Sequence, residues 1–133
     1  MAIILDADVI IRAEKGSFDF HKWAASQPAE QFEIAAVTVA ELWHGVERAT
    51  GVHKNRRERF LQNIVNLLPI IPYTEQTAYE HARIWAELES SGRMISYYDI
   101  IVAATALERG SKVATFNQRH YLQVKGLTVI EPK

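Results

Sequence analysis

Apolar and polar positions along the chain follow two patterns, one typical of buried strands and the other of amphipathic helices. The run AIIL at residues 2–5 is apolar throughout, which predicts a strand buried on both faces of a parallel sheet. Short apolar runs predict further strands near 34–37, 112–115 and 127–130, and a small strand at 70–71 between two prolines. Strands that alternate with helices predict an α/β fold with a central, mainly parallel sheet.

Apolar residues at helical spacing predict the helices that separate these strands. The predicted helices cover 7–14, 19–25, 39–48, 55–68, 77–88 and 99–109. Glycines end several of them, with Gly51 expected to break the third helix and Gly110 to cap the last. In the helix at 77–88, the positions expected to face the core are Ala78, Ala82, Ile84, Trp85 and Leu88.

Length and composition narrow the class of protein. A chain of 133 residues is expected to form one domain over 1–133, with a core large enough to need no cross-links. There is no cysteine, which excludes a disulfide framework and fits a reducing cytoplasm. The first apolar stretch is interrupted by Asp6 and Asp8, and no run approaches the roughly 20 apolar residues of a membrane span. We therefore expect a cytoplasmic protein with no membrane partner.

Three acidic residues lie where strands give way to helices. Asp6 directly follows the first strand, Glu41 follows the strand-like residues 33–37, and Asp99 opens the apolar helix near Ser96. Open α/β folds bind ligands at the carboxyl edge of the sheet, where such side chains converge. Carboxylates that gather at one edge repel one another, and hard divalent cations favour oxygen ligands.

Each acid also has a simpler interpretation. Residues 38–41 (TVAE) and 96–99 (SYYD) match the capping box, in which an acid three residues after a hydroxyl satisfies backbone N–H groups. Asp6 would likewise serve as the N-cap of the following helix. Taken singly, Glu41 and Asp99 are better explained as caps, and only their joint placement favours a metal site. The two roles are compatible, because a capping carboxylate has a second oxygen.

Four motifs in order along the whole chain resemble those of PIN-domain ribonucleases, specifically VapC-type toxins. They are IILD at 3–6, VTVAEL at 37–42 followed by Gly45, YDIIVAATA at 98–106 and TFNQRHY at 115–121. The resemblance implies a three-layer α/β/α PIN-like domain. It also implies an endoribonuclease that depends on Mg²⁺, or on Mn²⁺ as a substitute, acts on structured RNA such as tRNA, forms a homodimer and pairs with a cognate antitoxin.

The family's site residues map onto this chain with one departure. Asp6, Glu41 and Asp99 match the family's three main acids, which implies that they bind the metal and take part in catalysis. The fourth family position, acidic in many members, is Asn117 here. This departure lowers the expectation of a second metal ion more than the expectation of ribonuclease activity. Asp8 is a hypothetical substitute for the missing charge, although a solvent-facing acid is the preferred interpretation. His120 is a candidate proton donor, and packing near Tyr121 is preferred.

These residue types suit phosphodiester hydrolysis. A cation held by Asp6 and Asp99 would activate water and neutralise phosphate oxygens. Glu41 would bind the cation, orient water or accept a proton, whereas Asn117 can donate a hydrogen bond but cannot act as a base.

Two kinds of surface side chain suggest partners. Five basic residues lie close together and would contact a phosphate backbone, or form an ordinary solvated helix face. They are Arg48, Lys54, Arg56, Arg57 and Arg59. Five aromatic residues would line an antitoxin groove, or pack in the core. They are Phe18, Phe20, Trp23, Trp43 and Phe60.

Two other functions remain open on the sequence. One is a phosphotransferase or phosphatase that uses Asp6 as a nucleophile and Asp8 as an acid, although residues 112–121 lack the further acids such enzymes need. The other is a non-catalytic PIN-like module that binds RNA or protein, because the fourth acid is missing.

Overall fold

The computed structural model describes residues 1–133, and its strands and helices alternate along the chain. The strands are β1 (Ala2–Leu5), β2 (Gln31–Ala35), β3 (Ile70–Ile71), β4 (Lys112–Ala114) and β5 (Val129–Ile130). The helices are α1 (Ala7–Lys15), α2 (Phe20–Ala25), α3 (Ala36–Arg48), α4 (Gly51–Leu67), α5 (Glu75–Ser91), α6 (Tyr97–Arg109) and α7 (Gln118–Tyr121).

The strands form one five-stranded sheet in the order β3-β2-β1-β4-β5, and every neighbouring pair is parallel. Ile4 of β1 is in register with Glu33 of β2 on one side and with Val113 of β4 on the other. The chain builds the sheet outward from β1 first through β2 and β3, and then crosses to β4 and β5. The strand order therefore reverses between β1 and β4, which is where ligands bind in open parallel sheets.

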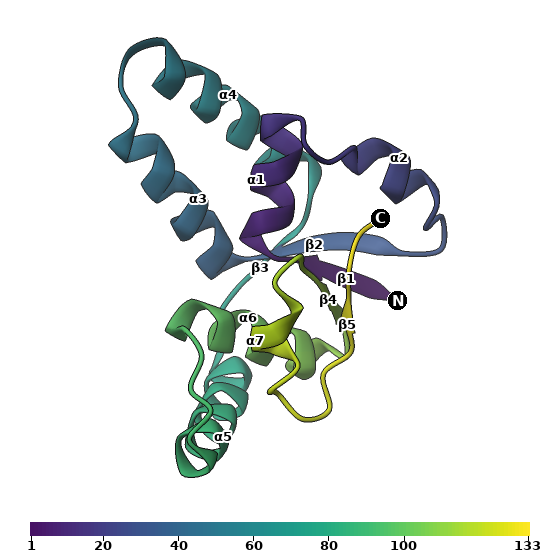
Figure 1. Ribbon diagram of the computed structural model, residues 1–133, viewed down its shortest axis with the longest axis vertical. Coiled ribbons are helices and arrows are strands. Elements are labelled where there is room, and N and C mark those ends of the chain that lie inside the picture. Colours follow the sequence, from purple (N-terminus) through teal and green to yellow (C-terminus); the bar gives the residue numbers. More distant parts are fainter.

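Helices cover both faces of the sheet and make a three-layer α/β/α arrangement (Figure 1). α1 to α4 lie on one side of the sheet and α5 to α7 on the other, while α3 and α4 form a hairpin that extends away from it. Side chains of β1 alternate between the two layers: Ile3 and Leu5 pack with α1 to α4, and Ile4 packs with α5 and α6. Because both faces of β1 are covered, all three side chains are buried. The predicted fold class is confirmed.

Local sequence explains most of the helix boundaries. α1 ends at Gly16, whose φ of 78° is left-handed and whose N–H donates to the carbonyl of Ala13. α5 begins with a capping box made by Thr74 and Thr77, and α6 begins at Ser96, whose hydroxyl accepts the N–H of Asp99. These side chains satisfy backbone donors that the first turn of a helix leaves free.

Several predicted boundaries and positions differ from the structure, and the short helix α7 has no counterpart among the predicted helices. The second strand ends at Ala35 and α3 begins at Ala36, so the apolar residues 36 and 37 belong to the helix. Gly51 does not separate two helices but opens α4, which begins four residues before the predicted start. In α5, Ile84 and Leu88 are buried as expected, but Trp85 is 39% exposed and Ala82 is also exposed. Because α5 packs mainly on α6, only a narrow stripe of it faces the core.

No helix of the structure is both long enough and apolar enough to cross a membrane.

Candidate active site

Asp6 lies at the carboxyl end of the central strand, next to β4. Its N–H donates to the carbonyl of Ala114, 3.0 Å away, which continues the pairing of β1 with β4 by one residue. Its Oδ1 accepts the N–H of Ala7 at 2.9 Å, and its Oδ2 accepts the hydroxyl of Thr115 at 2.8 Å. The side chain is 7% exposed and is also the N-cap of α1. The Asp6 carboxylate therefore both caps α1 and lies at the carboxyl edge of the sheet.

Glu41 reaches the site from the second turn of α3. The predicted capping box at 38–41 is wrong, because β2 runs directly into α3, and Ala35, the residue before the helix, makes no side-chain cap. The Thr38 hydroxyl is buried without a hydrogen-bond partner. Glu41 Oε1 is also buried without a partner, so this carboxylate has no structural contact that explains its position.

Asp99 lies on the first turn of α6, and only half of its predicted capping box forms. Its N–H donates to Ser96 Oγ at 3.2 Å, but its carboxylate does not return to the Ser96 backbone. Instead Asp99 Oδ1 accepts the hydroxyl of Tyr121 at 3.1 Å, and Oδ2 contacts His120 Nδ1 at 2.8 Å. Both oxygens of Asp99 are thus held by α7, which follows β4.

Asn117 and His120 lie together at the edge of the site. The Asn117 side chain does not cap α7, and its Nδ2 is 3.1 Å from His120 Nδ1. The Asn117 N–H donates to Thr115 Oγ1 at 2.9 Å. His120 faces Asp99 as well as Asn117, so it is part of the site rather than only a residue packed near Tyr121.

Asp8 lies at the same edge of the sheet, and the interpretation as a solvent-facing acid is wrong. Its Oδ2 accepts the N–H of Phe116 at 3.1 Å, and Thr115 Oγ1 is 3.4 Å from the same oxygen. The first turn of α1 carries it from Asp6 toward the segment that follows β4.

Thr115 and Tyr121 are site residues to which the sequence motifs gave no role. The Thr115 side chain is buried and is hydrogen-bonded to Asp6, while its backbone continues from β4. Tyr121 is fully buried although its hydroxyl is polar. A polar residue directly after an apolar strand is a usable signal for Thr115, whereas nothing in the local sequence indicates that Tyr121 contacts Asp99.

Burial and mutual repulsion disfavour the charged forms of these carboxyl groups. Burial raises the pKa of Glu41 to about 7, and the charges of Asp6 and Asp99 add to the rise. Burial raises the pKa of Asp6 to about 6, where the hydrogen bond from Thr115 opposes the rise and Asp8 and Asp99 add to it. Burial also raises the pKa of Asp8. Acidic residues whose charged forms are disfavoured in this way are characteristic of functional sites.

The donor set fits a divalent cation of the hard, oxygen-binding kind. Asp6, Glu41 and Asp99 offer only oxygen ligands, and Glu41 Oε1 is the buried acceptor that no group of the protein satisfies. As they are placed, however, no three acidic or histidine side chains stand close enough together to hold an ion. Asp99 in particular is held by His120 and Tyr121, so a bound cation would require its side chain to shift.

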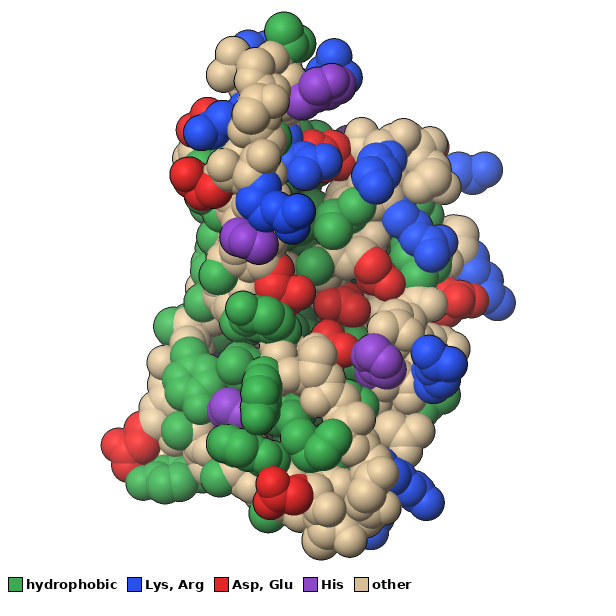
Figure 2. Space-filling view, turned by 60° about the vertical axis from the view of Figure 1, so that its left-hand side comes forward, with side chains coloured by type: hydrophobic (Ala, Val, Ile, Leu, Met, Phe, Trp, Pro, Cys, Tyr) green, Lys and Arg blue, Asp and Glu red, His purple; other side chains and the backbone are tan.

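Basic side chains lie on two sides of this acidic centre. Figure 2 shows acidic side chains near the middle of one face, with basic side chains above them and to the right. A cavity of about 170 Å³ beside Glu41 is lined by Lys15 and Arg57, and Arg57 also pairs with Glu14 at 3.5 Å. Of the basic cluster expected from the sequence, Arg57 is therefore the member that lies beside the site.

Comparisons with known proteins agree with this geometry. Residues 3–126 match the PIN domain family model, and the chain belongs to that family. It is 29% identical over 133 residues to Ribonuclease VapC1 of Rickettsia felis, with 98% of this chain and 96% of the relative covered. It is 30% identical over 139 residues to VapC ribonuclease Y4jK of Sinorhizobium fredii, with 98% and 96% covered. The expected resemblance to VapC-type PIN ribonucleases is confirmed.

A solved structure gives the same result for the fold. The crystal structure of VapBC2 from Rickettsia felis bound to a promoter DNA fragment matches with a TM-score of 0.90, at 19% identity and covering 100% of both chains. At this identity the match concerns the fold alone. Membership of the PIN family assigns the sequence Asp6-Ala7-Asp8 to a PIN domain rather than to a phosphotransferase.

Proposed function

We propose that residues 1–133, as a single PIN domain, form a divalent-metal-dependent endoribonuclease, the toxin of a toxin–antitoxin pair that cleaves structured RNA such as tRNA. The observation that carries this proposal is the buried, unpartnered Oε1 of Glu41, which lies with Asp6 and Asp99 at the switch point of a PIN domain. The relatives named ribonuclease VapC support the reaction class.

Asp6, Glu41 and Asp99 would hold the cation, Mg²⁺ or Mn²⁺, through their carboxylate oxygens. When bound, such an ion supplies a water of lowered pKa and charge to neutralise phosphate oxygens. Thr115 keeps Asp6 oriented through its hydroxyl, whereas Asp99 would exchange its contact with the Tyr121 hydroxyl for the cation. The exposed amide of Asn117 is placed to donate a hydrogen bond to a phosphate oxygen, but it has no proton-accepting group of suitable pKa.

The test is cleavage of mixed tRNA in Mg²⁺ or Mn²⁺, with Asp6→Asn as the decisive variant. Asp6→Asn is expected to abolish cleavage and, without metal, to keep or raise the melting temperature, because it removes a buried charge that faces Asp8 and Asp99. Asp19→Asn is the matched control, since Asp19 is an exposed helix cap outside the site and asparagine caps equally well.

Full cleavage by Asp6→Asn protein would exclude a nuclease site at this position. Loss of cleavage through unfolding alone would favour a purely structural role for Asp6. RNA binding without cleavage by the wild type would favour the non-catalytic PIN-like module.

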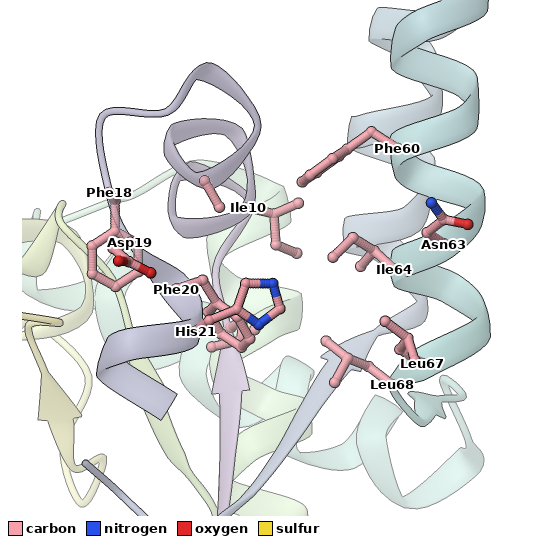
Figure 3. A pocket seen from close by; sticks show the side chains of 12 residues that line it. Ile10, Phe18, Asp19, Phe20, His21, Phe60, Asn63, Ile64, Leu67 and Leu68 are labelled. Carbon is pink, nitrogen blue, oxygen red and sulfur yellow. The ribbon is translucent and has the colours of Figure 1, made fainter. Parts of the chain in front are cut away.

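We also propose that an apolar groove between α1, α2 and α4 receives a segment of the cognate antitoxin. The cavity has a volume of about 390 Å³, and Figure 3 shows Phe18 and Phe20 on one side of it, with Phe60 and Ile64 of α4 and Leu68, which directly follows α4, on the other. Of the five aromatic residues considered from the sequence, Phe18, Phe20 and Phe60 line this groove, whereas Trp23 is buried in the core and Trp43 packs against it. An amphipathic helix is the usual occupant of a groove of this kind.

Co-expression with the product of an adjacent small reading frame would test this groove. Phe60→Asp is expected to reduce co-purification at least tenfold, because it places a charge in the apolar contact. Arg59→Asp, one residue away on an exposed position of α4, is the control and should retain the partner.

A homodimer, which the resemblance implies, would use a separate aromatic face on α5 and the start of α6. Tyr73, His81, Trp85 and Tyr97 form this aromatic face; His81 stacks on Trp85 at 5.8 Å and Trp85 meets Tyr97 at 5.7 Å between ring centroids. Figure 2 shows the apolar area in its lower half without a Lys or Arg side chain inside it. Exposed aromatic area without basic residues suits a second copy of the chain better than RNA.

A further inference from the structure

An open hollow lies beside the acidic centre and is separate from the cavity lined by Lys15 and Arg57. It has a volume of about 470 Å³ and is lined by Arg93, Met94 and Ile95, which connect α5 to α6, and by Arg119, His120 and Gln123 on and after α7. His120 joins the hollow to the site, because its Nδ1 is 2.8 Å from Asp99 Oδ2. A group bound in the hollow would therefore lie next to the carboxylates.

The two arginines of the hollow have no acidic partner. Arg57, Arg83 and Arg109 each make an ion pair with a glutamate, but neither Arg93 nor Arg119 lies within 4.0 Å of a carboxylate oxygen. Both residues are exposed, and they come from segments that only the tertiary structure brings together. Two unpaired guanidinium groups at one hollow repel each other and favour an anion between them, and the planar guanidinium fork matches phosphate oxygens.

We propose that Arg93 and Arg119 form a subsite that binds a backbone phosphate of the RNA next to the phosphate that is cleaved. This inference rests on the proposed ribonuclease function and adds a substrate-positioning element to it. The acidic centre repels a polyanion, so productive binding needs cations on its flanks. Lys15 and Arg57 supply them beside Glu41, and Arg93 and Arg119 supply them beside Asp99.

A protein partner explains the hollow less well. Met94 and Ile95 are the only apolar residues that line it, and the lining is otherwise arginine, histidine and glutamine, which offer hydrogen-bond donors in excess. The apolar groove at α4 and the aromatic face on α5 are instead formed mainly by hydrophobic and aromatic side chains, which suit a protein partner. The chemistry of the hollow thus matches phosphate, and an acidic peptide becomes an outcome of the test.

The experiment measures binding of fluorescein-labelled bulk tRNA by anisotropy, in the cleavage-deficient Asp6→Asn background, over a series of salt concentrations. Arg93→Gln and Arg119→Gln are each expected to weaken binding by about threefold to tenfold at low salt. The double variant should also lower the slope of log affinity against log salt by about 0.7 to 0.9, as expected for one lost phosphate contact, and each single variant should lower it by less. The loss of binding free energy in the double variant should be smaller than the sum of the losses in the two single variants, because both side chains contact the same phosphate.

Arg83→Gln is the matched control, since Arg83 already pairs with Glu80 and Glu87 on the outside of α5. It should leave both affinity and salt slope unchanged. Arg119→Lys should keep the salt slope and lose part of the affinity, because lysine retains the charge but not the guanidinium fork. In the cleavage-competent protein, the two Arg→Gln variants should raise KM and leave kcat close to the wild-type value.

The phosphate subsite would be overturned if both Arg→Gln variants bound tRNA with wild-type affinity and wild-type salt slope. If these variants lost only antitoxin binding, the hollow would be assigned to an acidic peptide instead. Either result leaves the nuclease proposal intact if the wild type cleaves tRNA. Conversely, weakened tRNA binding by these variants in a protein that does not cleave would support the subsite while the proposed activity fails.

Discussion

Glu41 shows most clearly how a single residue in this protein departs from what stability alone favours. A buried carboxylate oxygen with no donor costs free energy, and the neighbouring Asp6 and Asp99 increase that cost by repulsion. A helix position this close to the sheet would accept glutamine or leucine at lower cost. The residue is therefore better explained by the cation and substrate that it would face than by the fold.

The raised pKa values predict how the stability of the metal-free protein depends on pH. Folding raises the pKa of Asp6 from 3.8 to about 6 and that of Glu41 from 4.5 to about 7, so between these values the folded state binds more protons than the unfolded state. The free energy of unfolding should therefore fall as the pH rises from about 4 to about 7, and lowering the pH from about 8 to about 5 should raise the melting temperature in EDTA.

Glu41→Gln tests whether these carboxyl groups cause the pH dependence, because it removes the one with the higher pKa. The variant should show a flatter dependence of melting temperature on pH and a strongly reduced rate of tRNA cleavage. Glu89→Gln, at an exposed position of α5, should behave as the wild type. An unchanged pH profile together with full cleavage would leave Glu41 without a role in the site.

Asp8 and Asn117 give a second prediction at this scale. Asp8 is hydrogen-bonded to Phe116, directly before Asn117, so both positions can contribute charge to one cation site. Asp8→Asn is expected to raise the Mg²⁺ concentration for half-maximal cleavage, and adding Asn117→Asp should recover much of the loss. Effects that add independently in the double-mutant cycle would remove Asp8 as a substitute for the missing carboxylate.

At the scale of elements, the site depends on how three helices begin. Asp6 caps α1, Asp99 lies on the first turn of α6, and Asn117 precedes α7. The free N–H groups of a helix start favour negative charge, which partly offsets the repulsion between the acids. α3 differs, because it continues directly from β2 and places Glu41 one turn further along.

Ser96→Ala tests the contribution of one of these helix starts. Ser96 Oγ accepts the N–H of Asp99, and loss of such a cap costs about 1 kcal/mol of stability. Urea unfolding without metal should show this loss, whereas Ser90→Ala, within α5 on an exposed position, should change stability by much less. Equal effects of the two substitutions would indicate that the Ser96 hydroxyl does not stabilise α6.

At the scale of the whole molecule, surfaces of different chemistry surround one acidic centre. Basic side chains flank the centre (Figure 2), the apolar groove lies against α4 (Figure 3), and the aromatic face lies on α5 and the start of α6. Such a division agrees with the proposal that RNA, an antitoxin segment and a second copy of the chain bind to separate surfaces. Each surface can therefore be tested by a substitution that leaves the others unchanged.

Trp85→Glu is expected to convert the proposed homodimer into a monomer, because it places a charge at the centre of the aromatic face. Light scattering coupled to size-exclusion chromatography would measure the mass, and circular dichroism would confirm the fold. Val52→Glu is the control: Val52 is 72% exposed near the start of α4, away from this face. A dimer that survives Trp85→Glu would place the contact elsewhere.

The sequence by itself determined the number and order of the strands, the six longer helices, the fold class and the three acids matched to the family. This was possible because these features follow from local patterns: an apolar run such as residues 2–5, a glycine such as Gly16, and acids next to strand ends. Errors arose where two local signals competed. Residues 36 and 37 fit a strand as well as a helix, and only the pairing of β2 with β1 and β3 decided where the strand ends.

The tertiary structure decided which side chains meet at the site. Thr115 meets Asp6 because β4 pairs with β1, and His120 and Tyr121 meet Asp99 because α7 packs beside α6. Arg93 and Arg119 line one hollow although they are far apart along the chain. No local pattern encodes these contacts, since they depend on the order in which the strands join the sheet and on the packing of helices over it.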